Sequence, residues 1–321
     1  MKIKILVALV FLSLLFLPSC QQNGNDEPEI KEYKGGIEIE IDRNTLPSTA
    51  IRGKIFPLTF KIKNTGNYPA SGVVVVKGTS SFLEFKDPIG TSVSKSFSFN
   101  LDGRSAISTA QPEEAYSINV VPYLDPLTES KIANIEMLLC YSYSTVFKTS
   151  ICIDTHPELP SNQKACTFRS ISSIGQGAPI NVVSVEQNTY LEENGKRKVE
   201  FVITLRNMMQ GTPIPIGSAV PSPFNYCETG QMPEDAKMNR IIVGNIKLGD
   251  ILMGTSRHGI SFDCEGLGFG YKTIPFVNNE AKILCTAVFE EDVASYTTIL
   301  EIPLAYGYYA QTNIPVRIVK H

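Results

Sequence analysis

Apolar and polar residues alternate along much of this chain, most clearly in residues 135–153. The apolar positions of this stretch are Met137, Leu139, Tyr141, Tyr143, Ile151 and Ile153. A period of two that uses β-branched and aromatic residues predicts β-strands. We interpret the two runs, which flank Ser144–Lys148, as the arms of one hairpin.

The same pattern returns 165 residues later, near the end of the chain. This shift places Tyr141 on Tyr306 and Tyr143 on Tyr308, and it predicts a second hairpin over residues 298–318. A hairpin that ends one half of the chain and recurs at the end of the other indicates two related β domains in tandem.

Shorter alternating runs fill the rest of the chain. They predict strands at 37–41, 58–62, 73–76, 82–85, 97–101, 118–121, 180–186, 199–207, 241–248, 259–262 and 281–289. Asn207 repeats Asn64 at an offset of 143, so we expect the same strand-and-turn unit twice. After the N-terminal segment no stretch has a convincing helical period, which makes the expected class all-β.

We expect two tandem immunoglobulin-like β-sandwich domains, over residues 37–155 and 166–321. A length of 321 residues favours two domains, and an apolar fraction of 43% lets each bury a core. The predicted linker, residues 156–165, contains two prolines and should be semi-rigid. Each domain is expected to fold separately.

Two resemblances support this organisation. Leu58, Phe60 and Ile62, followed by Lys-Asn-x-Gly and a run of valines, resemble CARDB-like and related immunoglobulin-like modules. The segment Ser173–Pro179, the pair Cys152 and Cys166, and the tyrosines between 296 and 308 resemble archaeal secreted or lipid-anchored surface proteins without an assigned activity. This second resemblance covers roughly residues 130–318, and it implies fold and location only.

The N-terminus has the features of a lipoprotein signal peptide. Residues 1–19 begin with basic Lys2 and Lys4, continue with an apolar run, and end directly before Cys20. We expect cleavage there and lipidation of Cys20, followed by a flexible acidic tether up to residue 36. The expected location is extracytoplasmic, on the outer face of a membrane.

The other six cysteines form an even set, which in an exported chain predicts disulfides. We expect Cys140 to bond to Cys152 across the predicted hairpin. In the second domain three connectivities are open, of which we favour Cys166–Cys285 and Cys227–Cys264. Neither a C-x-x-C pair nor clustered histidines occur, so the sequence predicts no zinc site.

Composition and motifs argue against several functions. The net charge is −3 and Lys and Arg form no run, so we expect no nucleic-acid partner. The sequence lacks a nucleophile elbow, a dinucleotide fingerprint and a calcium loop, so no cofactor is expected. Ser256 and His258 occur two residues apart, and we interpret them as part of a polar loop.

Two loops are candidates for contact with a partner. One contains Phe269 and Tyr271 between glycines, and the other is Met208–Ile216. The alternative is that these side chains fold under and cap the core. We expect a lipid-anchored, non-catalytic binding or structural module of the cell surface, whose partners are the membrane and a surface protein or glycan. The alternatives are a subunit of a secretion, pilus or transport assembly and, third, an extracytoplasmic hydrolase.

Overall fold

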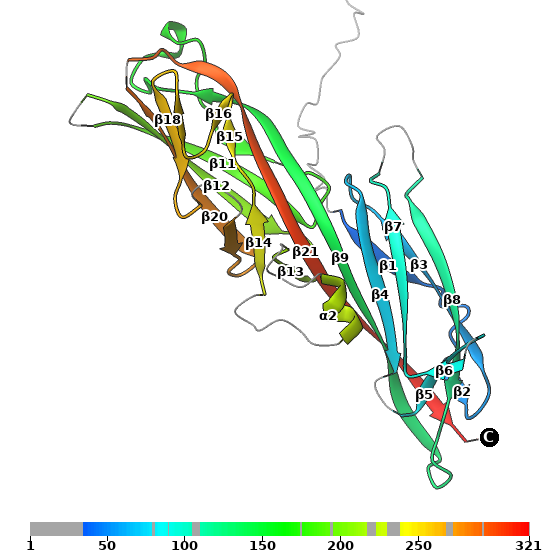
Figure 1. The fold of residues 1–321 in the computed structure, drawn as a ribbon. Coiled ribbons are helices and arrows are strands. Elements are labelled where there is room, and N and C mark those ends of the chain that lie inside the picture. The colour runs from blue at the N-terminus through cyan, green and yellow to red at the C-terminus, as the bar shows by residue number, and fades with distance from the viewer. Residues whose placement is uncertain are drawn as a thin grey trace, which may run out of the picture. The chain divides into compact units, whose positions relative to one another are not determined.

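The computed structural model describes residues 35–78, 81–88, 90–104, 110–173, 175–192, 195–216, 223–229, 238–267, 272–290 and 292–320. These residues belong to one compact unit, Tyr33–His321 (Figure 1). The predicted signal peptide and most of the predicted tether lie outside the described residues.

Strands dominate the described chain, and the all-β prediction is confirmed. The strands up to β9 are β1 (Ile37–Ile41), β2 (Thr49–Ile51), β3 (Phe56–Asn64), β4 (Ala70–Gly78), β5 (Leu83–Asp87), β6 (Gly90–Ser92), β7 (Ser94–Leu101), β8 (Glu113–Pro122) and β9 (Ser130–Ile153). The later elements are η1 (Ser161–Gln163), β10 (Ile171–Ser172), β11 (Ile180–Leu191), β12 (Arg197–Asn207), β13 (Thr212–Ile214), α2 (Pro223–Thr229), β14 (Arg240–Val243), β15 (Lys247–Leu248), β16 (Ile251–Leu252), β17 (Thr255–Arg257), β18 (Ile260–Cys264), β19 (Lys272–Pro275), β20 (Glu280–Phe289) and β21 (Tyr296–Val319).

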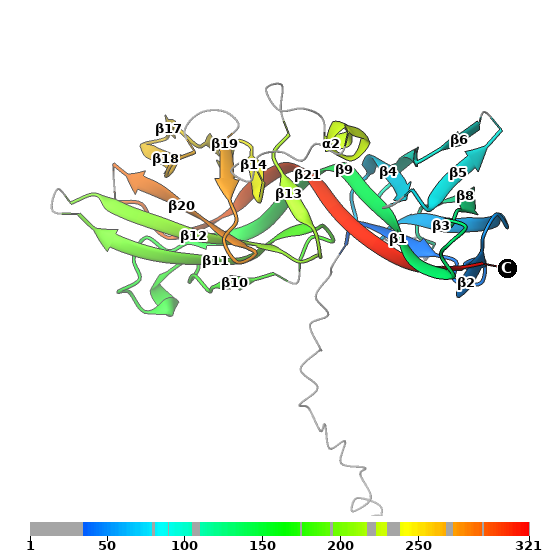
Figure 2. The same cartoon turned by 90° about the horizontal axis from the view of Figure 1, so that it is seen from below.

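The described strands form three sheets. One has the order β1-β3-β8-β5-β6 and another the order β10-β11-β12-β20-β18-β17. The third runs β16-β15-β21-β9-β4-β7, with β2, β13 and β14 also paired to β21. Figures 1 and 2 show the ribbon of β9 and β21 extending through both halves of the molecule, with one of the other sheets beside each half.

Both predicted hairpins are wrong, because β9 and β21 are single strands of 24 residues each. They pair antiparallel along their whole length, from Ser130 opposite Val319 to Ile153 opposite Tyr296. The segment Ser144–Lys148 contains no Gly, Pro, Asn or Asp to make a turn. The positions of β9 in the main core also stay on odd numbers on both sides of it, as an uninterrupted strand requires.

The predicted repeat appears in the strand registers. Ile37 lies opposite Asn64 in the β1–β3 pair, and Ile180 lies opposite Asn207 in the β11–β12 pair, each at an offset of 143. The sheet order β1-β3-β8-β5 is matched by β11-β12-β20-β18. The last strands of the two repeats, β9 and β21, pair with each other around Ser142 and Gly307.

This pairing means that the two halves exchange their last strands. The first part of β9 pairs with β4, whereas its second part runs on beside the first part of β21. In return, the end of β21 pairs with the first part of β9 and, in parallel, with β2. Residues 312–319 were predicted to belong to the second domain, yet they complete the sheet of the first half.

The predicted linker, residues 156–165, also differs from the expectation. Lys164 forms a 2.7 Å ion pair with Asp154, and these side chains are only 4% and 5% exposed. Asp154 also accepts hydrogen bonds from Ser295 and, through its carbonyl, from Thr189. Burial by itself would raise the pKa of Asp154, but Lys164 and Ser295 hold that pKa below its usual value. The segment itself is mostly exposed, and ion pairs of His156 with Asp292 and of Glu158 with Arg197 hold it against the second half. It therefore does not connect two separate bodies.

All six cysteines expected in disulfides are bonded, but all three predicted pairings are wrong. The bonds are Cys140–Cys227, Cys152–Cys166 and Cys264–Cys285. Because β9 is one extended strand, Cys140 and Cys152 lie twelve residues apart along it, or roughly 40 Å at the rise of a strand. A disulfide requires Cα atoms within about 7 Å, so these two cannot bond.

Each bond follows from the observed layers. Cys140 lies on the face of β9 away from the main core, where it meets Cys227 of α2 in a small second cluster. Cys264 and Cys285 are register partners in β18 and β20. Three disulfides indicate an oxidising, extracytoplasmic compartment.

Candidate binding site

The residues predicted from the sequence to make contacts fall into two groups. Cys20, Phe269 and Tyr271 lie outside the described residues. The other candidate loop, Met208–Ile216, is described, and it folds under as the alternative interpretation expected. Pro213 and Ile214 are buried in β13, which pairs with β21.

One cluster resembles a catalytic arrangement of hydroxyl, imidazole and carboxylate. His156 lies 2.9 Å from the Thr155 hydroxyl through Nδ1 and 2.7 Å from Asp292 through Nε2. The Thr155 side chain is fully buried, however, and its hydroxyl donates to the carbonyl of Val293 at 2.6 Å. This hydroxyl is therefore committed to the fold, so the cluster offers no accessible nucleophile.

Four buried tyrosines form the joint between the two halves. Tyr141 lies opposite Tyr308 and Tyr143 opposite Tyr306, with ring centroids 5.4 and 6.0 Å apart. Burial raises the pKa of all four phenols. These groups stay neutral at ordinary pH, so they serve as packing and hydrogen-bonding groups.

Two of these tyrosines form hydrogen bonds to the recurring turns at Asn64 and Asn207. Asn64 and Asn207 each accept a hydrogen bond from the backbone N–H two residues later and donate to the carbonyl four residues later. The Tyr143 hydroxyl accepts from the backbone N–H of Tyr68, next to the first turn. The Tyr308 hydroxyl donates to Asn207 and to the carbonyl of Met209. This joint links the two halves through ring contacts and hydrogen bonds.

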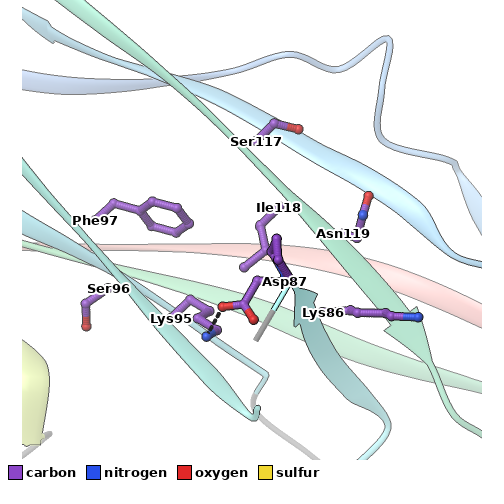
Figure 3. A pocket seen from close by; sticks show the side chains of 9 residues that line it. Lys86, Asp87, Lys95, Ser96, Phe97, Ser117, Ile118 and Asn119 are labelled. Atoms are coloured by element: carbon purple, nitrogen blue, oxygen red, sulfur yellow. Dashed lines mark ion pairs between the residues drawn. The ribbon is translucent and has the colours of Figure 1, made fainter. Parts of the chain in front are cut away.

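A groove of about 570 Å³ opens at one edge of the first half (Figure 3). It is formed by β5 and β8 of one sheet and by β7, the edge strand of the other. The lining residues are Lys86, Asp87, Pro88, Lys95, Ser96, Phe97, Ser117, Ile118 and Asn119. Lys95 and Asp87 form an ion pair across the groove, which ties the two sheets together at this edge.

The groove combines an apolar surface with basic side chains. Phe97 is half-buried against Phe60 and Tyr116, and Ile118 is buried. Lys86 is exposed and has no ion pair within the described part of the chain. Because Asp87 offsets Lys95, Lys86 leaves the groove with a net positive charge, which favours an acidic partner.

A smaller pocket of about 360 Å³ lies between the segment after β1 and β21. Its walls come from residues 41–48 and 312–315, among them Arg43 and Asn313. It forms only because the end of β21 returns to the first half.

Sequence reasoning missed the groove because its walls come from two sheets. A local signal exists in β7, where Ser94, Ser96 and Ser98 alternate with Phe97 and Phe99. Polar side chains on one face of a strand mark a solvent-exposed surface, but they do not show which strand lies at an edge.

The described part of the chain has no helix of the length and apolar character needed to cross a bilayer. No group of three or more metal-ligating side chains is found within the same residues.

Comparisons with known proteins do not identify a family. No family model matches the chain, and no curated protein matches it. Red sea bream transglutaminase aligns over 90% of this chain and 31% of its own length, with 10% identity and a TM-score of 0.21. The secreted serine protease VesC from Vibrio cholerae aligns over 90% and 53%, with 12% identity and a TM-score of 0.19. The chain thus spans about a third and about half of these two proteins, and at such scores neither fold nor activity transfers.

Proposed function

We propose that this protein is a lipid-anchored, non-catalytic binding module of the cell surface, and that the groove along β7 holds its partner. The groove is the observation that carries this proposal. It is a concave site on a scaffold braced by the strand exchange, the tyrosine joint and three disulfides. A rigid scaffold loses little conformational entropy when it binds.

The strand order supports the immunoglobulin-like part of the proposal. The first half places β1-β3-β8-β5 opposite β7-β4-β9 with the end of β21. This order corresponds to A-B-E-D opposite C′-C-F-G in an immunoglobulin sandwich, except that β5 precedes β7 in the chain and the other repeat supplies the last strand. Such sandwiches are common in cell-surface proteins, as the resemblance to archaeal surface proteins also implies.

The lipid anchor is supported by the signal peptide that ends directly before Cys20. The tether after it contains Asp26, Glu27 and Glu29. A Cys20→Ala variant should lose its metabolic lipid label and move from the detergent phase to the aqueous phase. Retention of the label would contradict the anchor and leave the binding site untouched.

The binding site is tested in the native cells by placing a photoreactive phenylalanine analogue at Asn119, which lines the groove. The matched control carries the analogue at Tyr190, an exposed residue of β11 in the other half. A cross-linked species should form from position 119 and not from position 190. The same species from both positions, or none from position 119, would reject the groove as the binding site.

A further inference from the structure

The chemistry of the groove is set by the outer edge of β7. The Val93 carbonyl, just before β7, accepts a 3.1 Å hydrogen bond from the backbone N–H of Gly78 in β4. In an antiparallel strand the backbone groups of successive residues point to opposite sides. The odd-numbered residues of β7 therefore bond to β4, and the even-numbered residues direct their N–H and C=O groups away from it.

Hydrogen bonds at the far end of β7 agree with this assignment. The Ser98 carbonyl accepts from the Tyr116 hydroxyl at 2.7 Å, and the Asn100 N–H donates to Glu114 at 3.3 Å. Both partners lie on β8, in the other sheet. These contacts cover the outer edge from Ser98 onward.

Between these contacts and the start of β7 the edge is open at Ser96. The Ser94 carbonyl accepts from the Ser92 hydroxyl at 2.7 Å, whereas Ser96 lines the groove, and among the described residues no strand pairs with the outer side of β7. Exposed backbone donors and acceptors along a strand edge are a template for another strand. The same sheet shows that a short segment suffices, because β2 adds to β21 with only three residues.

We propose that the groove binds an extended peptide segment of a partner protein, which adds as a strand to β7 beside Ser94–Ser96. This inference rests on the proposed function of the groove and names its ligand. In such a strand alternate side chains point into the groove, where Phe97 and Ile118 accept an aliphatic group. The flanking side chains are acidic, since Lys86 gives the site its net positive charge.

The aromatic contacts favour a peptide over a glycan. Phe97 packs its ring against Phe60 in an edge-to-face arrangement, with centroids 5.4 Å apart, and against Tyr116 at 5.2 Å. The ring is thus held within the sandwich and half-buried, so it offers a smaller surface than the fully exposed ring on which a sugar stacks. The open backbone edge, by contrast, matches the spacing of hydrogen-bonding groups in a peptide.

The test uses the full-length protein in detergent and fluorescent nine-residue peptides in which Glu alternates with Val, Ile, Leu or Phe. Fluorescence anisotropy should report saturable binding of at least one peptide. The same peptide with N-methyl groups on alternate amides should not bind, because its backbone cannot pair. Amide exchange at Ser96 should slow when the peptide is bound.

Two variants of one residue separate strand addition from general contact. Ser96→Pro removes the outward N–H, at an edge position where proline is tolerated, and should weaken binding about tenfold. Ser96→Thr keeps the N–H and should bind as the natural chain does. Lys86→Glu should also weaken binding, and more so at low salt.

The proposal is overturned if no peptide of the pool binds, or if the N-methylated peptide or the Ser96→Pro protein binds normally. Cross-linking of a glycan from position 119 would also overturn it, while leaving the proposed binding function in place. Loss of cross-linking at position 119 would instead reject the binding function itself.

Discussion

The tyrosine joint allows one prediction from a matched pair of substitutions. Tyr141 and Tyr308 lie opposite each other on β9 and β21, and both are essentially fully buried. The Tyr308 hydroxyl is 2.8 Å from Asn207 Oδ1 and 3.0 Å from the Met209 carbonyl. The Tyr141 hydroxyl is buried without a hydrogen bond of standard geometry among the described residues, although the backbone N–H of Ile37 makes a weaker contact with it. Tyr→Phe removes only the hydroxyl, so only the Tyr308 substitution should lower the stability.

The expected magnitudes follow from hydrogen-bond energetics. Tyr308→Phe removes a buried hydrogen bond and should cost about 1–1.5 kcal/mol of unfolding free energy. The cost stays moderate because Asn207 Oδ1 still accepts from the Met209 N–H at 3.3 Å. An unsatisfied buried hydroxyl carries a desolvation penalty of about 1–3 kcal/mol, so Tyr141→Phe should leave the stability unchanged or raise it by about 1 kcal/mol.

Thermal unfolding in non-reducing buffer measures both variants against the natural chain. For a folded unit of this size 1 kcal/mol corresponds to roughly 1.5–2 °C in Tm. Tyr308→Phe should therefore melt about 2 °C lower, and Tyr141→Phe at the same temperature or higher. Equal destabilisation by the two substitutions would refute the reasoning, because it would mean that the two hydroxyls are equivalent.

Four further predictions concern the exchange and the joint. Burial raises the pKa of the four joint tyrosines, so their contribution to the free energy of unfolding should be fully present below pH 10 and decrease above it. The decrease should reach up to about 1.4 kcal/mol per pH unit for each phenol that ionises only in the unfolded chain. Denaturant titrations at pH 8–11 measure this. Gly66→Ala would place a Cβ in steric overlap with the Tyr143 hydroxyl, so it should lower the free energy of unfolding by about 2 kcal/mol or more, with partial recovery when Tyr143→Phe is added. Urea unfolding measures this, and an unchanged stability would contradict the close approach. Residues 35–156 and 164–321 expressed apart should lack cooperative unfolding transitions, because each is missing a strand that the other donates; a sharp transition in either fragment would contradict the exchange. Non-reducing peptide mapping should recover Cys140 joined to Cys227, and a Cys140–Cys152 peptide would contradict the continuous strand.

Local pattern was enough to predict many of the strands of this fold and its recurring turn. Alternation predicts β3 from Leu58, Phe60 and Ile62 because a strand with one buried face must repeat every two residues. The offset of 143 between Asn64 and Asn207 predicts a recurring turn, and both asparagines make the same local hydrogen bonds. These features depend on residues only a few positions apart, so the chain itself specifies them.

The same kind of local evidence is misleading at Ser144–Lys148. The odd-numbered buried positions continue through it, and no turn-forming residue interrupts it. The stretch from Ser144 to Ser150 is mostly polar and therefore looks like a turn. Phe147 within it stays buried, however, and a strand tolerates polar residues wherever its partner or solvent satisfies them. The core positions stay odd-numbered from Tyr143 to Ile151, and this constant alternation indicates a single strand.

The partner of each strand was decided only in three dimensions. Whether β9 pairs with itself or with β21 depends on contacts between residues more than 140 positions apart, and that choice placed Cys140 against Cys227 and far from Cys152. The groove arises in the same way, since Phe97 and Ile118 meet only after two sheets stack. Alternation specifies which face of a strand is apolar, but many strands present similar faces. Packing of the whole chain selects among them, and with them the edge that β7 leaves open.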